Sequence, residues 1–303
     1  MPALRCNKVD RLLEPVRRRI EQQVLGLSGV GLGTVDFTQP ANDPGLYGPE
    51  SIIWRVHGDF TSMLCGGISA LLLQMLHPSA LAGVWDHSHF RSDMLGRLRR
   101  TAQFISVTSF GPTAAAERLI ARVRQIHWQV NGVDPSGNAY RASDPALLTW
   151  VHVAEARSFL AAHLRFRNPR LSGADQDAYY RQAMKVAWAL GARDVPASRA
   201  EVEAYLQAMR PRLVCDDRTR EVTRLLLHAP MPSRLAQPAG WLLMRAGIDL
   251  LPDWAIDQLH LDGPALRRVL VTPAVHYLAR VLRWSVRNGA WHRAMRRMGR
   301  QPV

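Results

Sequence analysis

Helical periodicity, broken at short intervals by proline and glycine, is the feature that most limits how this chain can fold. Apolar residues recur three and four positions apart in segments such as 7–25, 61–76 and 94–106. Residues 51–56 are the one stretch with strand character, and that stretch is short. The pattern therefore predicts an all-α protein, with a single multi-helix domain over residues 1–303.

Capping residues and prolines place several helix ends. Asp93 precedes the apolar pattern at 94–106, and Asp144 is followed directly by a proline, which is a strong helix start. Pro112 begins another helix that reaches about residue 130, and Pro78 ends or kinks the apolar helix at 61–76. The glycine-rich and proline-rich residues 28–50 indicate a loop. In the second half we expect helices at 174–190, 198–210, 216–228, 235–249, 252–259 and 263–287.

The charge balance is strongly basic. The chain has 39 Lys and Arg against 25 Asp and Glu, for a formal net charge of +14, and residues 264–303 contain nine Arg and no acid. Such a balance favours anionic partners: nucleic acid, an anionic membrane surface or an acidic cofactor. The simpler interpretation of Arg280, Arg283 and Arg287, about one helical turn apart, is a solvated basic face.

The cysteines and the N-terminal residues indicate in which cellular compartment the protein is expected. Cys6, Cys65 and Cys215 are far apart and odd in number, which argues against a disulfide framework or a zinc site. The first 25 residues lack the apolar core of a signal peptide. The longest apolar run, 63–76, is shorter than the roughly 20 residues of a membrane span. We therefore expect a cytoplasmic protein.

Two histidines lie within apolar helical stripes. His127 continues a stripe through Ile120 and Val123, and His152 shares a stripe with Phe159. A buried histidine either hydrogen-bonds to the surrounding structure, which is the commoner case, or binds a metal. Neutral imidazole is a frequent ligand of haem iron, and an apolar wall suits a macrocycle. The residue pattern alone does not rank one histidine above the other.

A third candidate is the segment at 96–101. Arg97 and Thr101 are four residues apart and share one helix face, which Phe104 continues. An Arg and a Thr directed into a pocket can bind a propionate and polarise a bound oxygen species. The alternative is an exposed basic turn.

Other chemical templates fit poorly. His77, Asp86, His87 and His89 could suggest a non-haem metal site, but their spacing matches no metalloenzyme motif. The chain also lacks HExxH, Walker A, GxGxxG and GxSxG patterns.

Short motifs follow one another in a particular order through the first half of the chain. They are HP at 77–78, GVWDHS at 83–88, GRLRRT at 96–101, FG at 110–111, VRQIH at 123–127, Gly132, Gly137, Tyr140, DP at 144–145 and WVH at 150–152. In this order and spacing they resemble the MpaB and latex-clearing-protein oxygenase family, most clearly over residues 50–165. The resemblance implies a globin-like helical core around a haem b pocket. It also implies enzymes that cleave carbon–carbon double bonds of polyisoprene or prenyl chains with dioxygen.

The resemblance also implies roles for individual residues. His127 matches the proximal iron ligand, Arg97 and Thr101 match residues at the haem pocket, and His152 takes a structural or supporting role. The residue before the threonine is a distal lysine in latex-clearing proteins, but here it is Arg100, whose guanidinium stays protonated and is a poor ligand. The distal side of this pocket is therefore expected to differ from that of a latex-clearing enzyme.

The sequence thus predicts an oxidoreductase, namely a haem b-dependent, iron-containing oxygenase that acts with dioxygen on a small apolar, isoprenoid or lipid-like substrate. One alternative is a non-enzymatic basic module that binds nucleic acid or an anionic membrane. Another is a haem-binding protein without oxygenase activity. Nucleic acid is the less expected partner, since helix-turn-helix spacing and aromatic–basic interleaving are lacking. The Arg-rich C-terminus suits peripheral contact with an anionic membrane.

Overall fold

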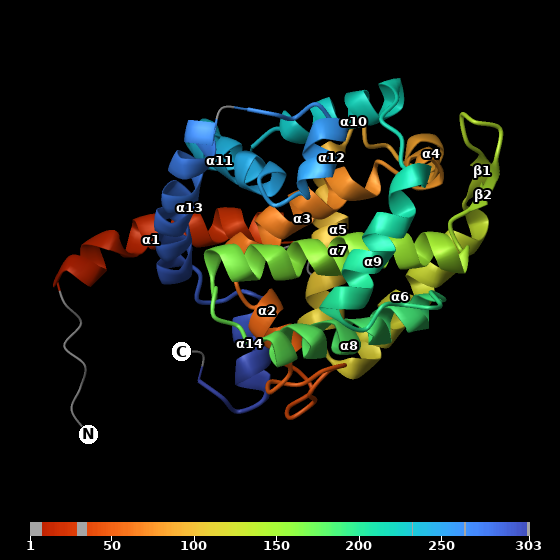
Figure 1. Cartoon of the computed structure of the whole chain (residues 1–303). Helices are drawn as coiled ribbons and strands as arrows, with labels where there is room; N and C mark the ends of the chain where they lie inside the picture. The colour runs from red at the N-terminus through yellow and green to blue at the C-terminus, as the bar shows by residue number, and fades with distance from the viewer. Residues whose placement is uncertain (1–7, 29–34, 232, 264, 302–303) are drawn as a thin grey trace.

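The computed structural model describes residues 8–28, 35–231, 233–263 and 265–301. It is all-α, as predicted, with one short antiparallel hairpin at its edge (Figure 1). The helices are α1 (Lys8–Leu27), α2 (Ile52–His57), α3 (Phe60–Gln74), α4 (Pro78–His87), α5 (Met94–Phe110), α6 (Thr113–Gln129), α7 (Pro145–Phe166), α8 (Gly173–Leu190), α9 (Arg199–Met209), α10 (Asp217–Leu227), α11 (Gln237–Ile248), α12 (Asp253–Gln258), α13 (Ala265–Ser285) and α14 (Ala290–Arg297). The strands are β1 (Asn131–Val133) and β2 (Ala139–Arg141), and two 3-10 turns, Arg210–Arg212 and Arg234–Ala236, precede α10 and α11.

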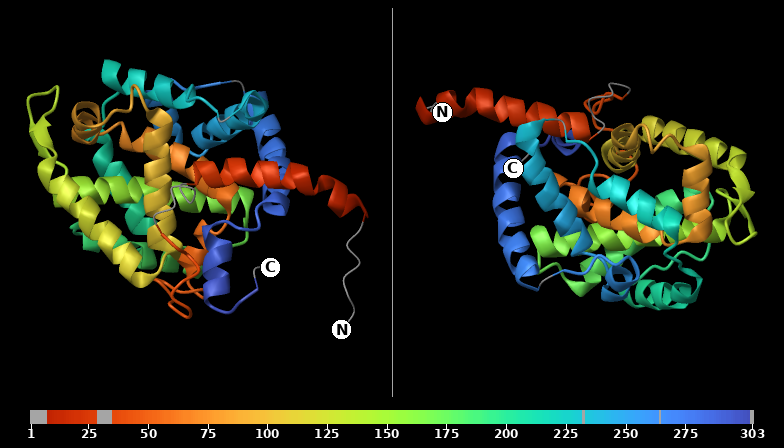
Figure 2. Two further views of the ribbon diagram at one scale, coloured as in Figure 1. Left: turned by 180° about the vertical axis from the view of Figure 1, so that it is seen from behind. Right: turned by 90° about the horizontal axis from the view of Figure 1, so that it is seen from above.

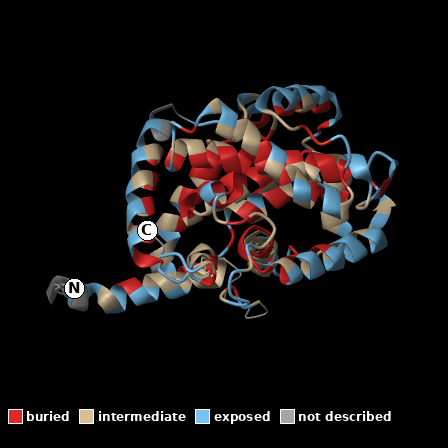
Figure 3. Cartoon of the chain, turned by 90° about the horizontal axis from the view of Figure 1, so that it is seen from below, coloured by how far each residue is buried: buried red, intermediate tan, exposed pale blue. Residues whose placement is uncertain are grey.

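Helices α3 and α7 form the centre of the molecule, where most buried residues gather (Figure 3). A Cβ added at Gly66 of α3 would lie 2.8 Å from the Phe159 ring of α7, so the helices approach this closely because the residue is glycine. The C-terminal end of α3 is also tied to α7. Trp150 Nε1 donates to the Gln74 carbonyl at 3.3 Å, and Gln74 Nε2 donates to the Val151 carbonyl at 3.0 Å.

The strand expected at residues 51–56 is wrong, because this segment forms helix α2. The Ser51 hydroxyl accepts a hydrogen bond from Trp54 N at 3.2 Å and caps the helix. Ile52, Ile53 and Val56 are all buried. A short continuous apolar run fits a buried helical turn as well as a strand, and periodicity cannot distinguish the two.

Local capping signals placed other helix ends correctly. The Asp93 side chain accepts from Gly96 N at 2.8 Å at the start of α5, and the Asp144 side chain accepts from Ala146 N at 2.7 Å at the start of α7. Pro78 does interrupt the apolar helix, and it then begins a helix of its own, α4, with His77 at the N-cap. The sequence did not predict α4, the hairpin or α14, and it ended α5 one turn early.

The basic C-terminal segment is only partly a solvated face. Arg283 pairs with Asp59 at 2.6 Å and also donates to the Phe166 carbonyl, so it joins α13 to the start of α3 and the end of α7. Arg297 is buried and donates to the carbonyls of Asp43 and Phe37 at 2.7 and 3.0 Å. These two guanidiniums therefore hold the C-terminal helices in place.

Cys65 and Cys215 are free thiols, and Cys6 lies outside the described residues. Among the described residues, no single helix has the length and apolar composition needed to cross a membrane. Helices α3 and α4 meet those criteria only as a pair bent by 104°. In this fold α3 packs in the core against α7.

Candidate functional site

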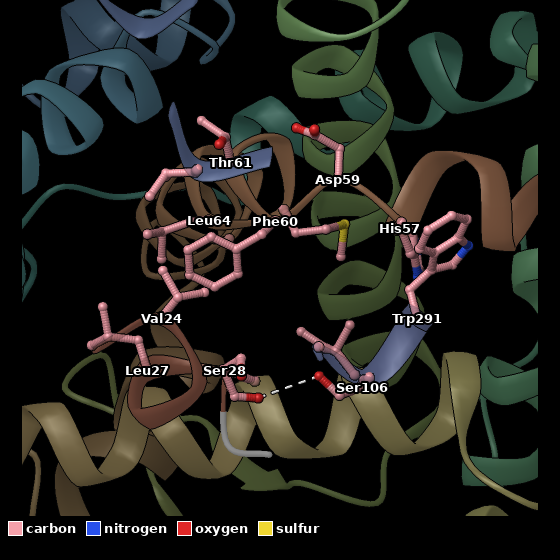
Figure 4. Close-up of a pocket in the computed structure, with 18 of the residues that line it drawn as sticks. Val24, Leu27, Ser28, His57, Asp59, Phe60, Thr61, Leu64, Ser106 and Trp291 are labelled. Atoms are coloured by element: carbon pink, nitrogen blue, oxygen red, sulfur yellow. Dashed lines mark hydrogen bonds between the residues drawn. The ribbon is translucent and has the colours of Figure 1, made fainter. Parts of the chain in front are cut away.

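A large cavity of about 870 Å³ lies among helices α1, α3, α5, α7, α11, α13 and α14 (Figure 4). Its lining is mostly apolar and includes Val24, Leu27, Phe60 and Leu64, which Figure 4 shows around the open space. At its edge Ser106 Oγ of α5 donates to the Ser28 carbonyl at 3.3 Å. The volume lies within the range of ligand and cofactor sites, about 300–1,000 Å³.

A smaller cavity of about 100 Å³ lies on the other side of α5, among α2, α5, α6, α7 and α8. His127 of α6 and His152 of α7 both line it, together with Phe104, Glu155 and Tyr179. The two histidines that the sequence left unranked therefore meet at one cavity. Both stripes described in the sequence run along helices that pack toward this space.

Four side chains line both cavities and form the wall between them: His57 of α2, Ile105 of α5, and Glu155 and Phe159 of α7. None of these four residues was predicted from the sequence to belong to the site. Glu155 left a signal there, because it is the one acidic residue of the long apolar segment that forms α7. The other three left no signal, since their proximity depends on how distant helices cross.

His57 is fully satisfied by the fold. Its Nδ1 lies 2.7 Å from Ser109 Oγ, and its Nε2 lies 3.0 Å from the Tyr179 hydroxyl. Burial, together with the neighbouring His163, lowers the pKa of His57 to about 3. A neutral imidazole held at both nitrogens is a structural part of the wall.

His127 differs from His57 in this respect. Its Nδ1 is buried and has no hydrogen-bond partner among the described residues. Burial lowers the pKa of the His127 imidazole, which favours the neutral form that ligates metals. His152 is neutral for the same reason, since burial lowers its pKa to about 4. A buried nitrogen with no hydrogen-bond partner is uncommon in folded proteins. It indicates that a bound group belongs there or that the nitrogen has a functional role.

Glu155 is the acidic group of the wall. Burial raises the pKa of its carboxyl to about 7, so this group holds or releases a proton near neutral pH. Its carboxyl has no hydrogen bond or ion pair with any other residue that the structure describes. Because Glu155 lines both cavities, its proton is available to either space.

The predicted Arg–Thr face is divided by the structure. Thr101 lines the large cavity, Phe104 lines the small one, and Arg97 lines neither. Arg97 is half-buried and donates to Ser88 Oγ at 2.9 Å, and burial together with nearby Arg100 lowers its pKa to about 10. No acidic side chain among the described residues lies within ion-pair distance of Arg97. Its charge thus remains available to an anionic group.

Arg100 is exposed and pairs with Asp93 at 3.3 Å, so its guanidinium points to the surface of α5. It lines neither cavity. Asp86, the acidic residue of the GVWDHS segment, is also exposed. Its carboxylate accepts a hydrogen bond from the Tyr140 hydroxyl at 3.0 Å. Neither residue contributes to the two cavities in this structure.

The cluster at His77, Asp86, His87 and His89 does not gather into a metal site. His77 packs against Trp150, whereas His87 Nε2 lies 3.1 Å from the Asn131 carbonyl on β1. Among the residues that the structure describes, no group of three or more His, Cys, Asp or Glu is placed to hold a metal ion.

The residues at the small cavity fit a haem in chemistry. His127 supplies a neutral nitrogen without a partner, and Phe104 and Ile105 supply an apolar wall. About 100 Å³ is too little room for a macrocycle, and the required volume lies in the large cavity across Ile105 and Phe159. A haem held by His127 therefore needs the side chains of this wall to move.

Comparison with protein families identifies a match to the chain. The family model described as "ER-bound oxygenase mpaB/B'/Rubber oxygenase, catalytic domain" matches residues 54–284. The matched segment includes both cavities' central helices, α3, α5, α6 and α7. No curated protein and no solved structure gives a significant match to the chain.

Proposed function

The chain belongs to the mpaB and rubber oxygenase catalytic-domain family and is an oxygenase; on that premise we propose that it depends on haem b held by His127. We propose further that residues 1–303 act as one oxygenase domain. The match to a catalytic domain favours an enzyme over a purely basic binding module.

The observation that carries the proposal is the unpartnered Nδ1 of His127. It lies in the VRQIH segment, which resembles the ligand-bearing segment of the family, and it faces a cavity together with His152. His57, the histidine of the wall, has both nitrogens occupied by protein groups, whereas the buried His163 at the large cavity also has ring nitrogens without a partner. His127 is thus free to bind a metal where His57 is not.

When bound, the haem supplies the activation of dioxygen; the protein supplies position, polarity and exclusion of water. Arg97 carries a half-buried positive charge that suits a propionate, and Thr101 presents a hydroxyl at the large cavity. Glu155 holds a proton between the two cavities. His152 supports the small cavity as a neutral neighbour of His127.

The large cavity favours a small apolar substrate, isoprenoid or lipid-like. Its walls are mostly apolar, and its volume of about 870 Å³ accommodates a folded chain of many carbons. Arg97 and Thr101 both belong to α5, which separates this space from His127. We therefore place the ligating histidine at the small cavity, and the substrate in the part of the large cavity that the haem leaves free.

The test is an absorption spectrum of the purified protein, oxidised and reduced, before and after addition of haemin. We expect a Soret band in the native protein and its loss in His127→Ala. His87→Ala is the matched control, because His87 is exposed and lines neither cavity, so its spectrum should match that of the native protein. Native protein that stays colourless after haemin is added would overturn the proposal, as would a His127→Ala variant that keeps an unchanged band.

A further inference from the structure

The outer side of α13 is apolar, although it faces away from the protein. Val269, Leu270 and Tyr277 are 66%, 64% and 70% exposed. Trp284, further along the same helix, is 37% exposed. The inner side is apolar as well and is buried, with Val275 and Leu282 in the core. Large apolar residues grouped on one exposed helix mark an interaction site rather than an ordinary surface.

Two neighbouring helices also expose apolar side chains. Helix α11 packs beside α13 and exposes Trp241. Helix α1 crosses α13, and its first half projects beyond the body of the protein (Figures 1 and 2). That projecting part exposes Leu12 and Val16, at 77% and 52%. We call the large exposed apolar residues of these three helices, with Arg280 and Arg287 of α13, the α13 face: Leu12, Leu13, Val16, Trp241, Val269, Leu270, Tyr277, Arg280, Trp284 and Arg287.

The charges on the α13 face are positive. Arg280 and Arg287 are exposed, and no acidic side chain among the described residues lies within ion-pair distance of either guanidinium. The whole of α13 contains no acid. On α1 the carboxylate of Glu14 is occupied by Arg17 and Arg18, and that of Glu21 accepts from Arg17 and from the backbone of Arg287 and Asn288. Exposed apolar and aromatic side chains with unpaired arginines are the composition of helices that lie in a bilayer interface.

The position of the large cavity favours a lipid surface over a protein partner. The inner side of α13 lines that cavity with Leu278 and Leu282, and α1 lines it with Ile20 and Val24. The same helices therefore carry the apolar outer face and the apolar inner chamber. An apolar substrate has low solubility in water, and a protein docked by this face would meet it where it is concentrated.

We propose that the α13 face docks onto an anionic lipid bilayer, with the large cavity on the inner side of the same helices. Leu270, Tyr277 and Trp284 enter the boundary between headgroups and acyl chains, and Arg280 and Arg287 contact anionic headgroups. Docking does not depend on haem; only the delivery of substrate into the large cavity rests on the proposed oxygenase function.

The experiment is co-sedimentation of the full chain with vesicles of phosphatidylcholine alone and of phosphatidylcholine mixed with phosphatidylglycerol. We expect binding to the mixed vesicles that weakens as salt is added. The double variant Leu270→Ser/Tyr277→Ser should bind the vesicles with an affinity that is lower by about tenfold or more, because two apolar side chains no longer enter the bilayer. Arg280→Gln/Arg287→Gln should lose mainly the preference for anionic vesicles.

Trp188→Ser is the matched control, because Trp188 is 56% exposed on α8, away from the α13 face. It should bind as the native protein does. Each variant's far-UV circular dichroism and haem spectrum report folding and the oxygenase site separately, so failure of docking and failure of haem binding are distinguishable. Absence of binding to the mixed vesicles would overturn the proposal. Equal binding by the Leu270→Ser/Tyr277→Ser variant would overturn it too, as would a lipid-free dimer that this variant dissociates.

Discussion

The small cavity at His127 and the large cavity beneath α1 and α13 share a wall, yet they are built from different kinds of residue. The small one, about 100 Å³, brings together the ionisable groups His127, His152 and Glu155. The large one, about 870 Å³, is mostly apolar and has the volume of a ligand site. His127 and His152 lie on one side of the wall, room for an apolar molecule lies on the other, and Glu155 borders both.

Because of this difference, the wall controls access between the two cavities. Ile105 and Phe159 are the apolar members of the wall, and their side chains cannot form hydrogen bonds that would fix them in place. His57 is fixed by two hydrogen bonds, so the wall cannot open on its side without breaking them. Ile105 and Phe159 are the side chains whose movement would join the two spaces.

Phe159→Ala is the most direct test of the wall between the two cavities, because removing this side chain joins them. Removing a buried phenylalanine costs about 3–5 kcal/mol of unfolding free energy, and Phe159 is 2% exposed. We expect the variant to unfold at lower denaturant concentration and to take up haemin or an apolar dye more readily. Chemical denaturation and absorption titration measure the two effects.

Leu72→Ala is the control for Phe159→Ala, because Leu72 is fully buried but lines neither cavity. It should lose stability, by about 2–5 kcal/mol, without a gain in uptake. Equal uptake by the two variants would show that general loosening, and not the wall, controls entry.

Glu155→Gln tests the acidic member of the wall. Burial raises the pKa of Glu155 from 4.5 to about 7, so the folded protein keeps a proton that the unfolded chain releases between these values. Glu155 should therefore lower the unfolding free energy as pH rises from 4.5 to about 7, by at most about 3 kcal/mol, whereas the buried His57 and His152, whose pKa values are lowered, raise it over part of the same range. The contribution of Glu155 is the difference between the native protein and Glu155→Gln, and this difference should shrink as pH rises, while the exposed Glu117→Gln on α6 should follow the native pH dependence. Denaturation curves across pH measure it, and a difference between native protein and Glu155→Gln that does not change with pH would contradict the prediction.

Gly66 and Gly67 test how closely α3 packs against the wall, because they are adjacent and only Gly66 lies close to Phe159. An added Cβ at Gly66 lies 2.8 Å from the Phe159 ring, whereas at Gly67 it lies 3.8 Å away. Gly66→Ala should lose about 1–3 kcal/mol through overpacking. Gly67→Ala should be neutral or gain up to about 1 kcal/mol from helix propensity. Thermal unfolding of the pair measures this, and equal shifts would show that α3 is free to move away from α7.

Thr101→Val has the smallest expected effect on stability, within about 0.5 kcal/mol, because Thr101 is exposed. Its hydroxyl borders the large cavity, so the haem spectrum and the rate of oxygenation should change in Thr101→Val and be retained in Thr101→Ser. An unchanged spectrum and rate in both variants would remove Thr101 from the site.

Most helix ends could be predicted because their causes are local. Asp93 and Asp144 cap through atoms two or three residues away, so the sequence contains both partners. The error at residues 51–56 has the opposite origin. A six-residue apolar run carries no periodicity of its own, and the surroundings of Ser51 and α2 decided that it would be helical.

The site could be predicted only in part. The sequence by itself determined that His127 and His152 each lie in an apolar helical stripe, and that Arg100 stands where a lysine is expected. Tertiary structure decided that both histidines reach one cavity, that Thr101 and Phe104 face different cavities, and that Arg100 points to solvent. It also assembled the wall from His57, Ile105, Glu155 and Phe159, which come from three helices. A stripe follows from the repeat of a single helix, whereas a wall follows from the close crossing of α3 on α7 and from the packing of α2 and α5 beside them.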